Sequence, residues 1–443
     1  MPEYHAMRAL ELVREAQSGR VSAQELAEYF LRRIERYDQS LGLNAVGELN
    51  PQALDEAKAL EENASPRDFP LFGLPILVKD NIDVAGLHTT AGSPALVDNL
   101  ARRDAPIVAN LRRAGAVVLG KTHMTEFANY TALDMPNGYS ALAGQVHSAY
   151  GAQCDPGGSS TGSAVAVSAG FCAVAIGTDT SFSIVGCAAE HGIVGLKPAC
   201  GALISAGIVP ISHTLDSAGP MARDVASALA VYAAMRGVPA TDCTLLPARG
   251  LRLAVNWAGE EAGPAQRQRY AELIEALRSA GAQVCEIEQP GDEPGMEALM
   301  QCEFREDLEA YLAEHEVPCK TLASIVRFYE AHPATCLRYG MHYLQAALAA
   351  GRSEARYAQA LERRAAARER VLQELKDVDA CLMAGWSDIM HFAGLPSIAL
   401  PLGMAQDGTP RGMILYGTDE TRLLRAALAM ETFAGPIAPP PVG

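Results

Sequence analysis

The stretch at residues 157–183 constrains the fold most, because it consists almost entirely of small residues (GGSSTGSAVAVSAGFCAVAIGTDTSFS). Its longest weakly polar run, 162–177, is too short and too rich in small residues to cross a membrane, so it predicts a buried helix at 162–169 and a strand at 173–177. The flanking chain alternates in the same way, with strands expected at 74–78, 116–119 and 193–196 and a helix at 105–114. This alternation predicts an α/β fold with helices on both faces of the sheet.

The remaining chain adds elements at both ends without dividing the protein. A capping box at 22–25 starts an N-terminal helix, and a second helix is expected at 51–63. Helix 223–236, strand 251–255, a mainly helical block at 296–376 and strands at 395–402 and 412–415 follow. No repeat or long linker separates them. We therefore expect one domain over 1–443, composed of N-terminal helices (1–60), a core (61–225) and a C-terminal part (226–443).

Charge and cysteine content narrow the class of protein. The net charge is −16, which argues against nucleic acid or an anionic membrane as a partner, because both need a basic surface. The ten cysteines are scattered, without a CxxC pair or zinc-ligand spacing, and the N-terminus lacks a signal-peptide pattern. We expect a reduced, cytoplasmic protein, either a monomer or a homodimer.

Hydroxyl groups and one lysine are the candidates for chemistry. Ser159, Ser160 and Thr161 lie in a glycine-rich turn, and Ser183 follows 24 positions after Ser159, in a turn that comes after a strand. A helix N-cap would also explain the first turn, and a solvated strand end would explain Lys79. If Lys79 is buried, its neutral amine can accept a proton, and the three features together predict a serine nucleophile whose base is a lysine reached through a second serine.

Other kinds of site fit less well. The glycines at 157–162 lack the GxxxxGK[ST] pattern of a phosphate loop. Glu126 has no second carboxylate or histidine at ligand spacing, and His123 lies at the wrong spacing for HExxH. We therefore predict no metal.

Six segments of this chain resemble the motifs of the amidase signature family. They keep the family's order and spacing and cover roughly residues 60–225. The segments are 73–81 (GLPILVKDN), 120–127 (GKTHMTEF), 157–164 (GGSSTGSA), 177–180 (GTDT), 192–198 (GIVGLKP) and 216–223 (DSAGPMAR). Weaker resemblance extends to 394–401, and segments 138–145, 208–212 and 339–343 look most similar to bacterial peptide amidases.

The resemblance implies a single amidase domain with a large mixed β-sheet core, and a Ser–cis-Ser–Lys triad without cofactors. Ser183 matches the nucleophile, Ser159 the bridging serine after a cis peptide bond, and Lys79 the base. The family's oxyanion hole maps onto the backbone N–H groups of Thr180, Ser181, Phe182 and Ser183, with Ser160, Thr161 and Asp179 in supporting roles.

Two departures from the family pattern affect the substrate pocket. Phe182 stands in a turn where the family usually has glycine, so either its φ is negative or its ring turns inward to shape the pocket. Val185 stands where the family often has arginine, so Asp179 needs another partner; Glu190 and His191 are candidates, although a surface position is the plainer expectation for His191.

The resemblance predicts an amidase that hydrolyses a C–N acyl bond of a small-molecule amide or peptide amide. Carbamates and aryl amides are alternative substrates, because a reshaped pocket would suit them. A glutaminase component of an amidotransferase is a second alternative, and a binding protein or degenerate enzyme is a third.

Overall fold

The computed structural model describes residues 3–63, 65–239, 247–257, 263–289, 295–350 and 353–442. Its strands are β1 (Val46–Leu49), β2 (Pro75–Lys79), β3 (Val117–Thr122), β4 (Tyr139–Ser140), β5 (Gly144–Gln145), β6 (Val174–Asp179), β7 (Val194–Lys197), β8 (Ser217–Ala222), β9 (Arg252–Asn256), β10 (Gln283–Ile287), β11 (Ala380–Met383), β12 (Ser397–Met404) and β13 (Pro410–Tyr416). Its α-helices are α1 (Ala9–Gln17), α2 (Ala23–Tyr37), α3 (Ala53–Asn63), α4 (Pro106–Arg113), α5 (Thr161–Ser168), α6 (Val185–Glu190), α7 (Val225–Arg236), α8 (Pro264–Ser279), α9 (Met296–Ala313), α10 (Leu322–Ala331), α11 (Pro333–Cys336), α12 (His342–Ala350), α13 (Glu354–Glu374), α14 (Ile389–Phe392) and α15 (Glu420–Glu431).

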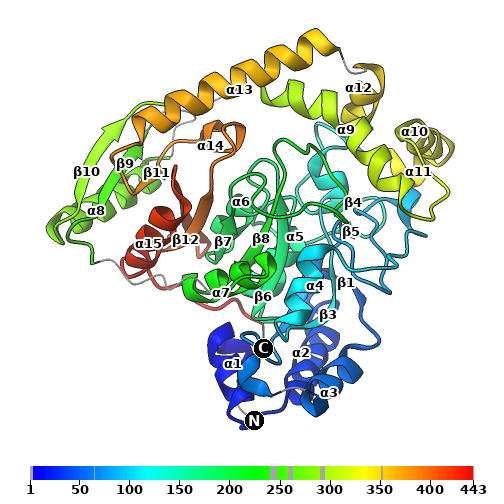
Figure 1. Cartoon of the computed structure of the whole chain (residues 1–443), viewed down its shortest axis with the longest axis horizontal. Coiled ribbons are helices and arrows are strands. Elements are labelled where there is room, and N and C mark those ends of the chain that lie inside the picture. The colour runs from blue at the N-terminus through cyan, green and yellow to red at the C-terminus, as the bar shows by residue number, and fades with distance from the viewer. Residues whose placement is uncertain are drawn as a thin grey trace.

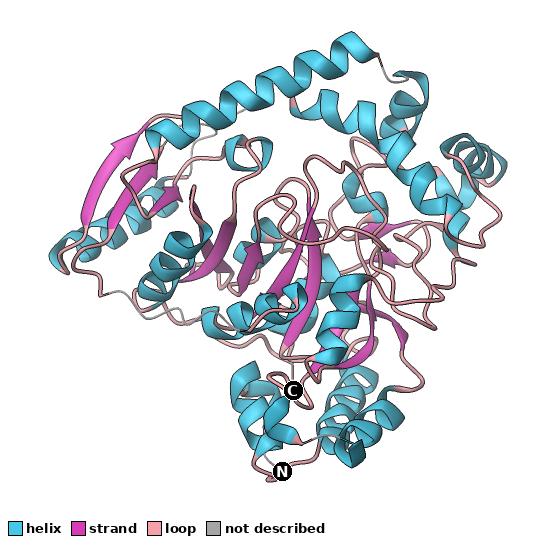
Figure 2. Cartoon of the chain, in the orientation of Figure 1, coloured by secondary structure: helices cyan, strands magenta, loops and turns pink. Residues whose placement is uncertain are grey.

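Most of the strands join one large mixed sheet in the order β1-β3-β2-β6-β8-β7-β12-β13-β11-β9-β10. Strand β2 runs parallel to β3 and β6, whereas β8 is antiparallel to both β6 and β7. Helices flank this sheet along its length (Figure 2). The observed architecture confirms the predicted α/β fold with a large mixed sheet.

The predicted elements of the core form with shifted ends. Helix 162–169 is α5, and seven of its eight residues, Thr161 to Val167, are buried. A Cβ on Gly162 would come 2.3 Å from the carbonyl oxygen of Ala45, so this helix packs at a distance that only small residues permit. The capping box at the start of α2 forms as predicted, with Ser22 accepting from the N–H of Glu25.

The helical block at 296–376 corresponds to α9 through α13. Helix α13 runs along the outside of the molecule beside α9, and α1, α2 and α3 gather near the N-terminus (Figure 1). No helix in the described ranges is long and apolar enough to cross a membrane.

Candidate active site

The carboxyl ends of β2 and β6 meet the turn that precedes α5. Lys79 ends β2 and Asp179 ends β6. The parallel register pairs Val78 with Ile176, which brings Lys79 beside the turn that follows β6. A Cβ on Gly177 would lie 2.8 Å from Ser160 Oγ, so a glycine at this position allows the two serine-bearing turns to approach each other.

The three residues of the predicted triad form a continuous hydrogen-bonded chain. Lys79 Nζ lies 2.8 Å from Ser159 Oγ, and Ser159 Oγ lies 3.0 Å from Ser183 Oγ. All three residues are buried, and Ser183 is the most accessible, with 5% of its surface exposed. The peptide bond between Gly158 and Ser159 is cis. The structure therefore brings the three residues together in the predicted order.

Lys79 lies in surroundings that favour its neutral form. Burial lowers its pKa from 10.5 to about 7. Its hydrogen-bond partners in the described chain are all uncharged: Ser159, Ser160 Oγ at 3.0 Å, and Thr178, whose Oγ1 lies at 2.8 Å and whose carbonyl oxygen lies at 3.3 Å. Close to neutral pH, a large share of Lys79 therefore carries a lone pair that can accept a proton.

The directions of these hydrogen bonds orient the lysine. Ser160 Oγ donates to the carbonyl oxygen of Thr178 (2.9 Å), and Thr178 Oγ1 accepts from Asn81 Nδ2 (3.0 Å). The hydroxyl oxygens of Ser160 and Thr178 are thus acceptors for two N–H bonds of Lys79. Lys79 Nζ also donates to Ser159 Oγ, so loss of that proton leaves the lone pair of the neutral amine facing Ser159.

The turn at 180–183 holds the four predicted oxyanion donors. The N–H of Phe182 donates to His391 Nε2 at 3.2 Å, and the carbonyl oxygen of Ser183 accepts from the N–H of Ser160. In the described part of the chain, the N–H groups of Thr180, Ser181 and Ser183 have no acceptor. These three groups are therefore available to a ligand, whereas the N–H of Phe182 is occupied.

Phe182 adopts a left-handed backbone, with φ of 62°, so the alternative of a negative φ is wrong. Its ring is buried, stacks on Trp386 with ring centroids 3.7 Å apart, and meets the edge of His391 at 4.3 Å. These two aromatic contacts hold a side chain in a conformation that ordinarily favours glycine.

Asp179 pairs with a residue that the sequence did not suggest. Its Oδ1 lies 3.2 Å from His391 Nδ1, and its Oδ2 accepts from the N–H groups of Ile184 (2.7 Å) and Val185 (3.2 Å). Burial raises the pKa of this carboxyl, but the contacts with His391 and the N–H of Ile184 outweigh burial and hold the pKa at about 2. Asp179 is thus ionised at neutral pH.

The proposed partnership of Asp179 with Glu190 and His191 is wrong. His191 is fully buried rather than at the surface, and it contacts Ser168 Oγ and the carbonyl oxygen of Pro156. Burial lowers the pKa of His191 to about 4, so it is neutral. Glu190 lies instead 3.9 Å from Arg411.

Thr161 stabilises the first serine-bearing turn. Its Oγ1 donates to the carbonyl oxygen of Gly157 at 2.6 Å, which closes the turn that carries Ser159 and Ser160. The supporting positions predicted for Ser160, Thr161 and Asp179 all lie within this cluster of contacts.

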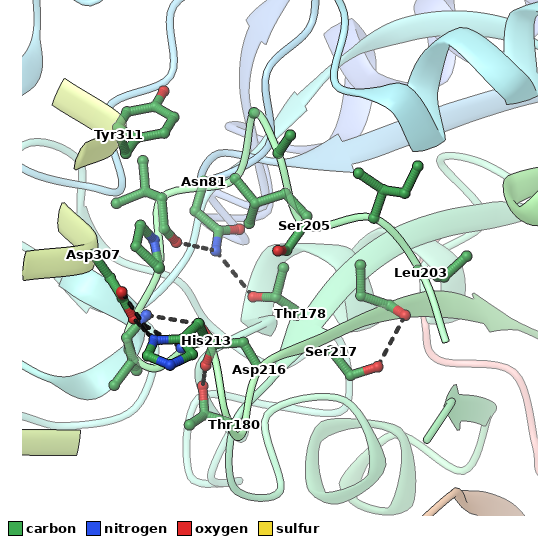
Figure 3. Close-up of a pocket in the computed structure, with 18 of the residues that line it drawn as sticks. Asn81, Thr178, Thr180, Leu203, Ser205, His213, Asp216, Ser217, Asp307 and Tyr311 are labelled. Atoms are coloured by element: carbon green, nitrogen blue, oxygen red, sulfur yellow. Dashed lines mark hydrogen bonds and ion pairs between the residues drawn. The ribbon is translucent and has the colours of Figure 1, made fainter. Parts of the chain in front are cut away.

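A pocket of about 530 Å³ reaches Thr180 of the turn at 180–183, although Lys79, Ser159 and Ser183 are not among the residues that line it. Asn81, Thr178 and Thr180 line it together with Asp307 and Tyr311 of α9, which lie on one side of the view in Figure 3. Leu203, Ile204, Ile208, Val209 and Ile211 contribute much of the apolar lining. Helix α9 thus lines a cavity that is also lined by Thr178, a hydrogen-bond partner of Lys79.

One group of side chains has the composition of a metal site. Ligand atoms of His213, Glu303 and Asp307 lie within 4.8 Å of one another. However, His213 Nδ1 already contacts Asp307 at 2.9 Å, and its Nε2 lies 3.3 Å from Glu303. This geometry describes a hydrogen-bonded cluster that links 211–216 to α9.

Sequence reasoning missed His391, Trp386 and Thr178. His391 and Trp386 lie more than 200 positions from Ser183 and carry no motif that links them to it. Thr178 lies within the 177–180 motif, and its place at the end of a strand beside Lys79 was the available signal.

Comparison with known proteins agrees with this geometry. The Amidase family model matches residues 25–385. A probable amidase of Arabidopsis thaliana is 32% identical over 93% of this chain and 87% of its own length. A glutamyl-tRNA(Gln) amidotransferase component from Exiguobacterium sibiricum is 30% identical over 95% of this chain and 96% of its own length.

A solved structure extends the likeness to the whole fold. The native peptide amidase of Stenotrophomonas maltophilia superposes with a TM-score of 0.89 at 34% sequence identity, covering 99% of both chains. The matched range contains the serine-bearing turns, Lys79 and the pocket wall. The chain belongs to the amidase signature family, and it is an enzyme that hydrolyses amides.

Proposed function

We propose that this enzyme cleaves its amide through a covalent acyl-enzyme on Ser183. Ser183 Oγ attacks the carbonyl carbon while its proton passes to Ser159, and the proton of Ser159 passes to Lys79. Lys79 returns a proton through Ser159 to the leaving nitrogen as the C–N bond breaks. Water then hydrolyses the ester by the same relay. The observation that carries this proposal is the unbroken chain of 2.8 and 3.0 Å contacts that ends on a lysine with a pKa of about 7.

The turn at 180–183 supplies the oxyanion hole in this proposal. Negative charge develops on the carbonyl oxygen when Ser183 attacks, and fixed N–H donors stabilise it. Ser160 and Thr161 hold the first turn, and Asp179 anchors the segment after the nucleophile through the N–H groups of Ile184 and Val185.

The pocket supports a small linear amide or a peptide amide as the substrate. Its volume of about 530 Å³ lies within the usual range for small-molecule sites, and its apolar lining suits an aliphatic group. The likeness to the peptide amidase of Stenotrophomonas maltophilia adds support.

Carbamates and anilides remain alternative substrates of the same triad. Trp386 is 44% exposed although it stacks on Phe182, so an aromatic surface lies close to the nucleophile. A panel of chromogenic anilides, carbamates and peptide amides separates these classes by their kcat/KM values.

A glutaminase role is a second candidate, favoured by the nearly full-length match to a component of glutamyl-tRNA(Gln) amidotransferase. Such a protein would hydrolyse glutamine and transfer ammonia within an assembly. Measuring ammonia release from glutamine, with and without an added amidotransferase partner, decides between the two. Glutamine turnover that depends on the partner would favour the glutaminase.

The direct test is intact-protein mass after treatment with a fluorophosphonate. We expect one adduct on the wild type and none on Ser183→Ala, while Ser279→Ala, at an exposed position of α8, serves as a serine control and keeps the adduct. A well-folded wild type that never forms an adduct would contradict the proposed nucleophile.

We also propose that residues 1–443 form a single cooperative domain of a cytoplasmic monomer or homodimer. Light scattering after size exclusion measures the mass, and a single unfolding transition would support one domain.

A further inference from the structure

A short segment from the C-terminal part braces the oxyanion turn. We call residues 386–391, which lead into and include most of α14, the bracing segment. Asp388 Oδ1 accepts from Ser181 Oγ at 3.2 Å, His391 Nε2 accepts from the N–H of Phe182 at 3.2 Å, and Trp386 stacks on the ring of Phe182. Two consecutive residues of the turn are therefore held by one segment that lies about 200 positions away in the chain.

The contacts of His391 indicate which of its ring nitrogens accepts a hydrogen bond. Nε2 faces an N–H donor, so it carries a lone pair and the ring proton sits on Nδ1. Nδ1 lies 3.2 Å from Asp179 Oδ1 in an ion-pair contact, and neither of these buried atoms has a hydrogen-bond partner in the described chain. A carboxylate on the Nδ1 side of the ring favours the tautomer that carries its proton there.

The hydrogen bond between Phe182 and His391 also affects the neighbouring peptide groups of the turn. His391 occupies the N–H of Phe182 and fixes that peptide plane in a residue with left-handed φ. The N–H groups of Ser181 and Ser183, on either side, are left without an acceptor in the described chain. A turn that rotated freely at Phe182 would not keep two donors aimed at one oxygen atom.

We propose that His391 is a positioning residue that holds the oxyanion turn, so that the N–H groups of Ser181 and Ser183 receive the oxyanion. The inference builds on the proposed acyl-enzyme on Ser183 and removes Phe182 from the four predicted donors. His391 acts through the backbone of Phe182 and does not touch the reacting atoms.

Three substitutions at His391 separate its two contacts. In His391→Gln the amide oxygen reaches the position of Nε2 and can accept the N–H of Phe182. In His391→Asn the amide reaches only the position of Nδ1, so it keeps the contact with Asp179 and loses the acceptor. His391→Phe keeps a ring beside Phe182 and has no acceptor.

The readout is the second-order rate constant for labelling Ser183 with a fluorophosphonate, because the reaction also builds negative charge on an oxygen beside the turn. We expect His391→Gln to label within about threefold of the wild type. We expect His391→Asn and His391→Phe to label about 10- to 100-fold more slowly, since losing an oxyanion donor outright costs about 10²–10³ in rate and here the donors are only misaligned.

His191→Gln is the matched control, because His191 is also fully buried and contacts no residue of the 180–183 turn. Its labelling rate should stay close to that of the wild type. If His391→Phe does not fold, the labelling rates of His391→Gln and His391→Asn still show whether the acceptor at Nε2 matters.

Equal labelling rates for His391→Gln and His391→Asn would overturn the inference, as would wild-type rates in folded His391→Phe. Failure of the wild type to label at Ser183 would instead contradict the proposed function, so the two failures are distinguishable.

Discussion

Replacing Lys79 with methionine tests the buried neutral lysine through two measurements that move in opposite directions. Methionine has a similar volume and no titrating group. Each hydrogen-bond partner keeps another contact: Ser159 bonds to Ser183, Ser160 to the carbonyl oxygen of Thr178, and Thr178 Oγ1 to Asn81. We expect the variant to lose the acyl-transfer base and, at neutral pH, to become more stable than the wild type.

The magnitude follows from the pKa of Lys79, which is 10.5 for an ordinary lysine and about 7 in the folded protein. Because the folded value is lower, the unfolded chain binds more protons between pH 7 and 10.5, and wild-type stability rises with pH across that window. The burial penalty is about 5 kcal/mol at pH 6 and about 1.5 kcal/mol at pH 9.5. The stability advantage of Lys79→Met should therefore shrink by about 3 kcal/mol between these pH values.

Urea unfolding of both proteins at pH 6 and pH 9.5 measures this difference. Lys58→Met is the control, because Lys58 is 60% exposed and its replacement should produce no such trend. A stability difference between wild type and Lys79→Met that stays constant with pH would refute the depressed pKa. Retention of wild-type kcat in the variant would refute the base.

Further predictions follow from the same contacts. Below about pH 7 the wild-type kcat/KM should fall about tenfold per pH unit, because protonated Lys79 cannot accept a proton, and a flat profile down to pH 5 would contradict this. Ser159→Ala should lower kcat by about 10²–10⁴ with little change in fold, measured by steady-state kinetics beside circular dichroism. Phe182→Gly should destabilise the protein by about 2–4 kcal/mol in urea unfolding, because the lost stacking on Trp386 exceeds the relief of the left-handed φ, and a gain in stability would reverse that ranking.

The alternation of small-residue strands and helices made the central fold predictable. Strands β2, β3, β6 and β7 formed within a few residues of their expected positions. Strand β8 was not expected, and its Gly219 and Pro220 have low propensity for a central strand. It nevertheless lies between β6 and β7, where a Cβ on Gly219 would come 1.9 Å from the carbonyl oxygen of Leu196. Close packing against a neighbouring strand thus overrode the local propensity.

The candidate site likewise contains residues that the sequence predicts and residues that it does not. Lys79, Ser159 and Ser183 belong to local motifs, so their residues could be named from the sequence. The partner of Asp179 could not, because His391 reaches it only through the packing of α14 against the turn. Phe182 was correctly singled out, but its tolerance of a positive φ depends on the rings of Trp386 and His391, which no local pattern connects to it.

The strand order has a consequence for synthesis of the chain. Strand β7 lies between β8 and β12, yet about 200 residues separate β7 from β12 in the sequence. At about 5–20 residues per second, a ribosome needs roughly 10–40 s to produce that interval. During this time β7 is an unpaired edge that can associate with other nascent chains. His391 also emerges late, so the oxyanion turn gains its brace only when most of the polypeptide has been translated.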